Sequence, residues 1–262
     1  MSRLFTQEDV PERHNFPLMP RESLKLSRAF RRYAPESEVV MKKGLTEIVF
    51  ILDRSGSMGG LESDTIGGFN STLEKQKKAE GEARVTTVLF DGEYELLHDR
   101  IPVNEVRPLT GEDYYVRGCT ALLDAVGRTI ERITRAQRAS KEEYRADKVM
   151  FVIITDGMEN ASREYSYSKV KKMIEQVREE NGWEFMFLGA NIDAAAEAER
   201  LGIDRRRAAR YCADSEGTAL NFDVVGDVMC CMRKRSMSKS IFSELVDGAL
   251  SRVREDYKRR GK

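Results

Sequence analysis

The sequence predicts an α/β protein: a doubly wound, mostly parallel sheet with one antiparallel edge strand and helices on both faces. Short apolar runs, typical of buried strands, alternate with longer segments whose apolar residues recur at helical spacing. The run at 149–154 is apolar throughout, as expected for a central parallel strand covered on both faces. The dipeptide Asp91-Gly92 between two strand-like segments indicates a hairpin, which supplies the antiparallel edge.

The elements follow one another in a regular order along the chain. Strands are expected at 46–53, 84–90, 94–98, 148–155, 184–189 and 210–213. Helices are expected at 61–79, 120–138, 168–180, 193–201 and from 217 to the C-terminus, with a break near 236–240. In such sheets ligands bind beyond the carboxyl ends of the strands, so candidate site residues are sought there.

Three segments differ in composition. Residues 1–44 hold four of the six prolines and show no sustained period, which predicts an N-terminal arm that is extended or partly helical. The α/β domain is expected over 45–235, and a C-terminal helical extension over 236–262.

Charge and cysteine usage exclude some classes of function. The 262 residues include 44 Lys+Arg and 44 Asp+Glu, and a net charge of zero argues against a global polyanion-binding role. The N-terminus has no apolar signal core and no window resembles a membrane helix, so a cytoplasmic location is expected. The four cysteines form no C-x-x-C pair and there are only two histidines, which does not predict a zinc site.

Five oxygen-bearing residues stand at strand ends or in loops. Asp53, Ser55 and Ser57 follow the first strand, Thr120 precedes a helix, and Asp156 follows the strand at 148–155. Each alone is commonly a helix cap. Five such residues at one sheet edge instead favour a site for a hard divalent cation, because Mg²⁺ prefers oxygen ligands.

The order and spacing of these residues resemble the metal-ion-dependent adhesion site (MIDAS) of von Willebrand factor A (vWA) domains, over about residues 45–235. The resemblance implies a Rossmann-like vWA fold, direct ligation by Ser55 and Ser57, and ligation by Thr120 in the ligand-binding state. It implies that Asp53 and Asp156 act through water and that an Asp or Glu of a partner completes the site. No motif position is substituted, so an intact site is expected, with Mg²⁺ as cofactor and Mn²⁺ or Ca²⁺ as alternatives.

Some neighbouring residues are candidates for the rim of this site, where they would contact a partner: Gly118, Tyr114, Glu159 and Asn160. Within the family, the chain resembles the stand-alone bacterial cytoplasmic type of vWA protein, some members of which are tied to stress operons. The family's conformational switch, if it operates here, would move the helix at 217–235.

The resemblance implies a metal-dependent protein-interaction module that is not an enzyme, with no membrane or small-molecule substrate. A metal-dependent phosphate-ester hydrolase is one alternative, although the haloacid-dehalogenase type requires an acid where Ser55 stands. The chain also lacks a G-x-x-x-x-G-K-[ST] phosphate loop and a G-x-S-x-G elbow. RNA binding through the basic C-terminal region is another alternative, although a solvated helix end explains those charges as well. The basic residues concerned are Arg252, Arg254, Lys258, Arg259, Arg260 and Lys262, with Arg205, Arg206 and Arg207 as a second group.

Overall fold

The computed structural model describes residues 44–234 and 238–261, so the expected N-terminal arm lies outside the described residues. A six-stranded sheet in the order β3-β2-β1-β4-β5-β6 forms the centre of this part. Only β3 runs antiparallel to its neighbour. The strands are β1 (Thr46–Asp53), β2 (Ala83–Phe90), β3 (Tyr94–Pro102), β4 (Lys148–Thr155), β5 (Glu184–Gly189) and β6 (Ala208–Arg210). The predicted fold class is therefore confirmed.

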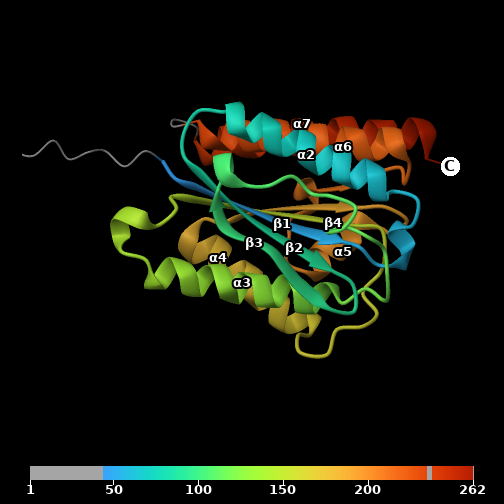
Figure 1. Cartoon of the computed structure of the whole chain (residues 1–262), viewed down its shortest axis with the longest axis horizontal. Coiled ribbons are helices and arrows are strands. Elements are labelled where there is room, and N and C mark those ends of the chain that lie inside the picture. Colours follow the sequence, from blue (N-terminus) through green and yellow to red (C-terminus); the bar gives the residue numbers. More distant parts are fainter. Residues whose placement is uncertain (1–43, 235–237, 262) are drawn as a thin grey trace, which may run out of the picture. The chain divides into compact units, whose positions relative to one another are not determined.

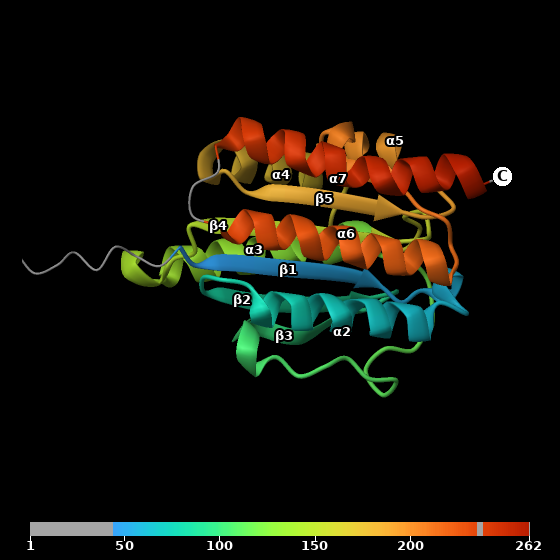
Figure 2. The same ribbon diagram turned by 90° about the horizontal axis from the view of Figure 1, so that it is seen from above.

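Helices cover both faces of the sheet (Figures 1 and 2). One face carries α2 (Glu62–Lys78), α6 (Ser215–Arg233) and α7 (Lys239–Arg260). The other face carries α3 (Leu122–Ala139), α4 (Tyr167–Asn181) and α5 (Ala194–Arg200). Short 3-10 turns lie at Gly56–Met58, Val103–Glu105, Glu142–Tyr144 and Arg205–Arg207. No helix of the described residues is long and apolar enough to cross a membrane.

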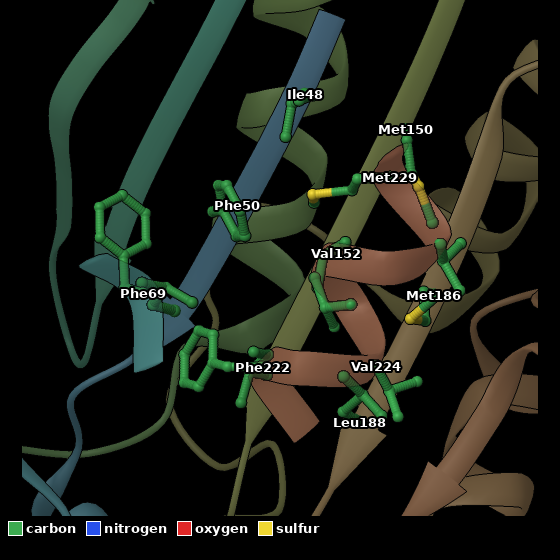
Figure 3. Close-up of a cluster of buried hydrophobic side chains, with 14 of the residues drawn as sticks. Ile48, Phe50, Phe69, Met150, Val152, Met186, Leu188, Phe222, Val224 and Met229 are labelled. Carbon is green, nitrogen blue, oxygen red and sulfur yellow. The ribbon is translucent and has the colours of Figure 1, made fainter. Parts of the chain in front are cut away.

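The core beneath α6 shows how this helix is oriented (Figure 3). Every residue of β1 is buried, as expected for a strand flanked by β2 and β4 and covered on both faces. Met229, near the end of α6, lies at the level of Met150 at the start of β4, whereas Val224 lies beside Leu188 near the end of β5. Lys148, the first residue of β4, donates to the carbonyls of Met232 and Lys234 at the end of α6. The first turns of α6 therefore lie over the carboxyl ends of the parallel strands.

Two expected elements are displaced, and a third, β3, extends to Pro102 and not only to His98. The last strand is β6 at 208–210 and not 210–213, so most of the expected segment follows the strand. Tyr211 donates its N–H to Gly189 and turns inward there. Helix α3, which was expected to begin at Thr120, begins at Leu122. Ala121 has non-helical angles (φ −91°, ψ 59°) and donates its N–H to the Asp91 carbonyl.

The basic C-terminal helix is engaged in contacts within the chain. Arg254 of α7 donates to the carbonyl oxygens of Ala208 (3.2 Å) and Arg206 (2.8 Å) along the outer edge of β6. Most of the other arginines of the two basic groups form ion pairs: Arg206 with Asp204, Arg207 with Glu184, Arg252 with Asp223, and Arg259 and Arg260 with Asp256.

Candidate metal centre

The first carboxylate of the candidate site, Asp53, is held by hydrogen bonds at the end of β1. One carboxylate oxygen accepts the backbone N–H of Ser55 at 2.7 Å, and the other accepts the hydroxyl of Thr155 at 2.5 Å. Burial raises the pKa of Asp53 to about 6, although these hydrogen bonds oppose the shift. A positive charge nearby would favour the ionised form and offset this cost of burial.

Three hydroxyls converge on one point beside this carboxylate. The hydroxyl oxygens of Ser55 and Ser57 lie 3.0 Å apart. A Cβ atom at position 157 would lie 2.9 Å from the Thr120 hydroxyl, 3.0 Å from that of Ser57 and 3.7 Å from that of Ser55. The missing side chain of Gly157 therefore leaves a small cradle of oxygens. Ser57 is exposed, so the cradle opens to solvent.

The second carboxylate, Asp156, is 2% exposed, and neither of its oxygens has a hydrogen-bond partner in the protein. Burial raises its pKa, and the neighbouring Ser57 hydroxyl opposes that shift. Buried carboxylates without partners are rare because removing them from water is costly. Asp156 therefore requires a positive charge or a polar ligand.

These oxygens fit a small divalent cation. Two oxygens bound at right angles to an octahedral ion, each about 2.1 Å from it, are about 3.0 Å apart. The Ser55 and Ser57 hydroxyl oxygens are hydrogen-bonded to each other at this same separation, so they could occupy two such positions without a large movement. Within the described ranges, no three His, Cys, Asp or Glu side chains come together as a metal site. The fit therefore depends on the hydroxyl oxygens of Ser55, Ser57 and Thr120.

The loop that carries Thr120 is fixed by two of the expected rim residues. The Thr120 N–H donates to the side-chain oxygen of Asn160 at 2.9 Å, and the Asn160 N–H donates back to the Thr120 carbonyl at 3.0 Å. Glu159 accepts the N–H of Leu123 in the first turn of α3 at 2.9 Å. Both side chains thus join the segment after Asp156 to the start of α3.

The other two rim candidates have different surroundings. Gly118 is exposed, adopts φ +67°, and accepts the Gly56 N–H on its carbonyl at 3.3 Å. Tyr114 is only 1% exposed, and its hydroxyl donates to the Asp53 carbonyl. A surface role for Tyr114 is therefore incorrect, because burial keeps its ring from a partner. Its neighbour Tyr115 is 45% exposed and is the aromatic side chain available there.

A buried ion-pair cluster beside the site was not anticipated. The Arg54 side chain is fully buried and pairs with Asp91 at 3.0 Å and with Glu95 at 2.7 Å. Arg117 pairs with the same Asp91 oxygen at 2.7 Å and donates its N–H to the Arg54 carbonyl. The cluster joins the Asp53–Ser57 loop to the segment that leads to Thr120. The only sequence signal for it is an arginine directly after a buried strand.

Some solved structures are similar to this chain in fold. No protein-family model matches the chain, and no curated protein matches it in sequence. Proximal thread matrix protein 1 (PTMP1) from the mussel byssus is similar over 71% of this chain and 46% of that protein, with 14% identity and a TM-score of 0.50. Its form with a zinc-occupied MIDAS motif is similar over 73% and 47%, with 15% identity and a TM-score of 0.50.

A von Willebrand factor type A structure from Catenulispora acidiphila is similar over 70% of this chain and 42% of that one, with 13% identity and a TM-score of 0.48. The chain spans about half the length of the PTMP1 structures that it matches. At these identities the likeness concerns the fold, which is the vWA-like α/β arrangement expected from the sequence.

Proposed function

We propose that the chain is a metal-dependent protein-interaction module that binds an Asp or Glu side chain of a partner through a divalent cation. The observation that carries this proposal is Asp156, a buried carboxylate without a partner beside three converging hydroxyls. The structures of PTMP1 with which the fold is shared include one with a zinc-occupied MIDAS motif, which supports the same interpretation. When bound, the cation supplies an electron-poor centre that a carboxylate can ligate.

Each residue has a distinct part in this proposal. Ser55, Ser57 and Thr120 would hold the cation through neutral oxygens, which leave its positive charge available to an incoming anion. Asp53 and Asp156 would act through water, as the resemblance implies, and balance part of the charge. Mg²⁺ is the proposed cofactor because small hydroxyl ligands suit a small hard ion, with Mn²⁺ as the nearest substitute.

The surface around the cradle supports contact with a protein. Tyr115 and Met158, both large and apolar, are 45% and 63% exposed and stand close in sequence to Gly118 and Asp156. Exposed aromatic and methionine side chains are enriched at protein interfaces. A partner could therefore gain apolar contacts beside its ligating carboxylate.

The two alternatives have less support. Hydrolysis requires a general base, yet the hydroxyl nearest to Ser55 is that of Ser57, and His98 is buried against Thr87 on β2. RNA binding requires available positive charge, and most arginines of the two basic groups are paired within the chain. The geometry therefore favours the interaction module.

Two measurements test the proposal. The first is calorimetric titration with Mn²⁺ of the wild type, Ser55→Ala and Asp156→Ala, in which only the wild type should bind well. The second is capture of proteins from a native lysate on immobilised wild type and Asp156→Ala, each with Mg²⁺ and with EDTA. A protein retained only by the wild type with Mg²⁺ is expected. Equal retention in all four arms would contradict the proposal.

A further inference from the structure

A group of buried polar side chains lies on the α6 side of the candidate metal centre. We call Asp156, Tyr211, Thr218 and Asn221 the buried polar cluster. All four are at most 2% exposed. Both oxygens of Asp156, both amide atoms of Asn221 and the hydroxyls of Tyr211 and Thr218 have no hydrogen-bond partner in the protein. Six polar atoms in a protein interior are thus unaccounted for.

The orientation of α6 places Thr218 and Asn221 at the level of the metal centre. These residues are three apart and therefore share one face of the helix. Val224 already lies beside Leu188, near the end of β5 (Figure 3), and Thr218 and Asn221 precede it on α6. The two polar side chains therefore lie farther toward the carboxyl edge of the sheet, where Asp156 follows β4.

Tyr211 lies between the strand ends and α6. Its N–H donates to Gly189 at the end of β5. The next residue, Cys212, packs so tightly against α6 that a Cβ atom on Gly217 would lie 2.2 Å from its carbonyl oxygen. In the sheet Gly189 is paired with Thr155, the residue before Asp156. Tyr211, which follows β6, and Asp156, which follows β4, therefore lie on either side of the end of β5.

Buried polar groups without protein partners are satisfied by ordered water, and a buried water usually makes about three hydrogen bonds. We propose that the buried polar cluster lines an internal hydration site, which binds ordered water and connects the metal centre to α6. The proposal rests on the metal-dependent function proposed above. In it, Tyr211, Thr218 and Asn221 are positioning residues: they hold the water through which Asp156 reaches the cation.

The hydration site has a consequence for α6. Because Thr218 and Asn221 belong to its first two turns, ordering of the water by a bound cation would also stabilise those turns. Hydrogen exchange of the amides in the first half of α6 should slow when Mn²⁺ is added, and the effect should be smaller in Asn221→Leu.

The main test compares variants of similar shape that lack the polar atoms: Tyr211→Phe, Thr218→Val and Asn221→Leu. The control is Thr46→Val, which removes another buried hydroxyl without a partner, at the opposite end of β1. Calorimetry with Mn²⁺ should give a dissociation constant about tenfold higher for each cluster variant, as for other outer-shell partners of metal ligands. Thr46→Val should bind as the wild type does.

Stability of the metal-free proteins separates this role from a general packing defect. Urea unfolding in EDTA should give cluster variants that are no less stable than the wild type, because each loses polar atoms that had no protein partner. Wild-type Mn²⁺ affinity in all three variants would overturn the hydration site while leaving the proposed function intact. An equal loss in Thr46→Val would also overturn it. A wild type that binds no Mn²⁺ would overturn both.

Discussion

The two sides of the candidate metal centre differ in how their buried polar groups are satisfied. On the side of β2 and β3, Arg54 is bound by Asp91 and Glu95, and Arg117 shares Asp91. On the side of α6, six buried polar atoms have no partner in the protein. On the first side the charges are paired within the protein and form a frame for the loops, although the Nη2 atom of Arg54 is buried without a hydrogen-bond partner. The second side requires a ligand or water, and we place the function there.

The pKa values of carboxyl groups on the two sides are also shifted in opposite directions. On the paired side, the Arg107 guanidinium lowers the pKa of Asp113 to about 2. At the metal centre, burial raises the pKa of Asp53 to about 6. The protein therefore stabilises the ionised acid on one side and disfavours it on the other. Four experiments test this contrast.

The largest effect is expected from breaking the frame. Asp91→Ala leaves the fully buried Arg54 guanidinium without its principal partner, which should lower the free energy of unfolding by about 3 kcal/mol in urea titration. The control Asp99→Ala breaks the exposed pair with Arg132, and a loss below about 1 kcal/mol is expected. Similar losses in the two variants would show that Arg54 is not the frame's critical charge.

The second effect concerns the cradle. Wild type at Mn²⁺ a hundredfold above its dissociation constant should gain about 2.7 kcal/mol in free energy of unfolding. Gly157→Ala should lose most of this gain, because the added methyl lies 2.9 Å from the Thr120 hydroxyl. Gly111→Ala, where a Cβ meets nothing within 4 Å, is the matched control. If Mn²⁺ stabilises Gly157→Ala as much as the wild type, the cation does not bind in the cradle.

A smaller loss of stability is expected where the two sides meet, at the hydrogen bond from Tyr114 to Asp53. Tyr114→Phe removes the hydroxyl that donates to the Asp53 carbonyl, and a net loss of about 1 kcal/mol is expected because a buried acceptor is left unpaired. The packing of the ring is kept. Chemical denaturation with and without Mn²⁺ would detect the change, and no loss in either condition would mean that this hydrogen bond does not support Asp53.

The smallest effect is a pH dependence on the paired side. Because the folded-state pKa of Asp113 is lowered, its contribution is fully present above the unfolded value of about 4 and is lost as the pH falls toward 2. Arg107 is 55% exposed, so solvent screening limits the contribution to about 1 kcal/mol or less. Asp113→Asn should reduce the loss of stability between pH 4 and pH 2. An unchanged slope would contradict the assignment.

The sequence identified those elements whose signals are local. Residues 148–155 and 184–189 form strands with the expected bounds because long apolar runs bounded by polar residues leave little choice. The strand β6 was misplaced because Ala208 and Ala209 carry no β preference and are buried by tertiary packing alone. The five candidate metal-site residues were named from a motif, and their ligation of a cation remains a prediction.

Other features could not be read from the sequence because they depend on distant partners. The partner of Arg54 lies 37 positions away, and nothing near Asp91 indicates a buried ion pair. Thr218 and Asn221 look like ordinary polar residues of an amphipathic helix, and only the packing of α6 buries them. Conversely, the sequence around Tyr114 suggests an exposed loop residue, whereas the residue is buried and its hydroxyl donates to the Asp53 carbonyl.

The contacts of Arg254 have a consequence for solubility. Sheet edges with free backbone groups can pair with strands of other molecules, and this leads to aggregation. Arg254 occupies the carbonyl oxygen of Ala208 in β6 and that of Arg206 in the turn before it, so fewer backbone groups of this short strand are free for pairing. At the opposite edge, irregular register between β2 and β3 disturbs the ladder. We therefore expect a chain without α7 to self-associate more readily than the full chain.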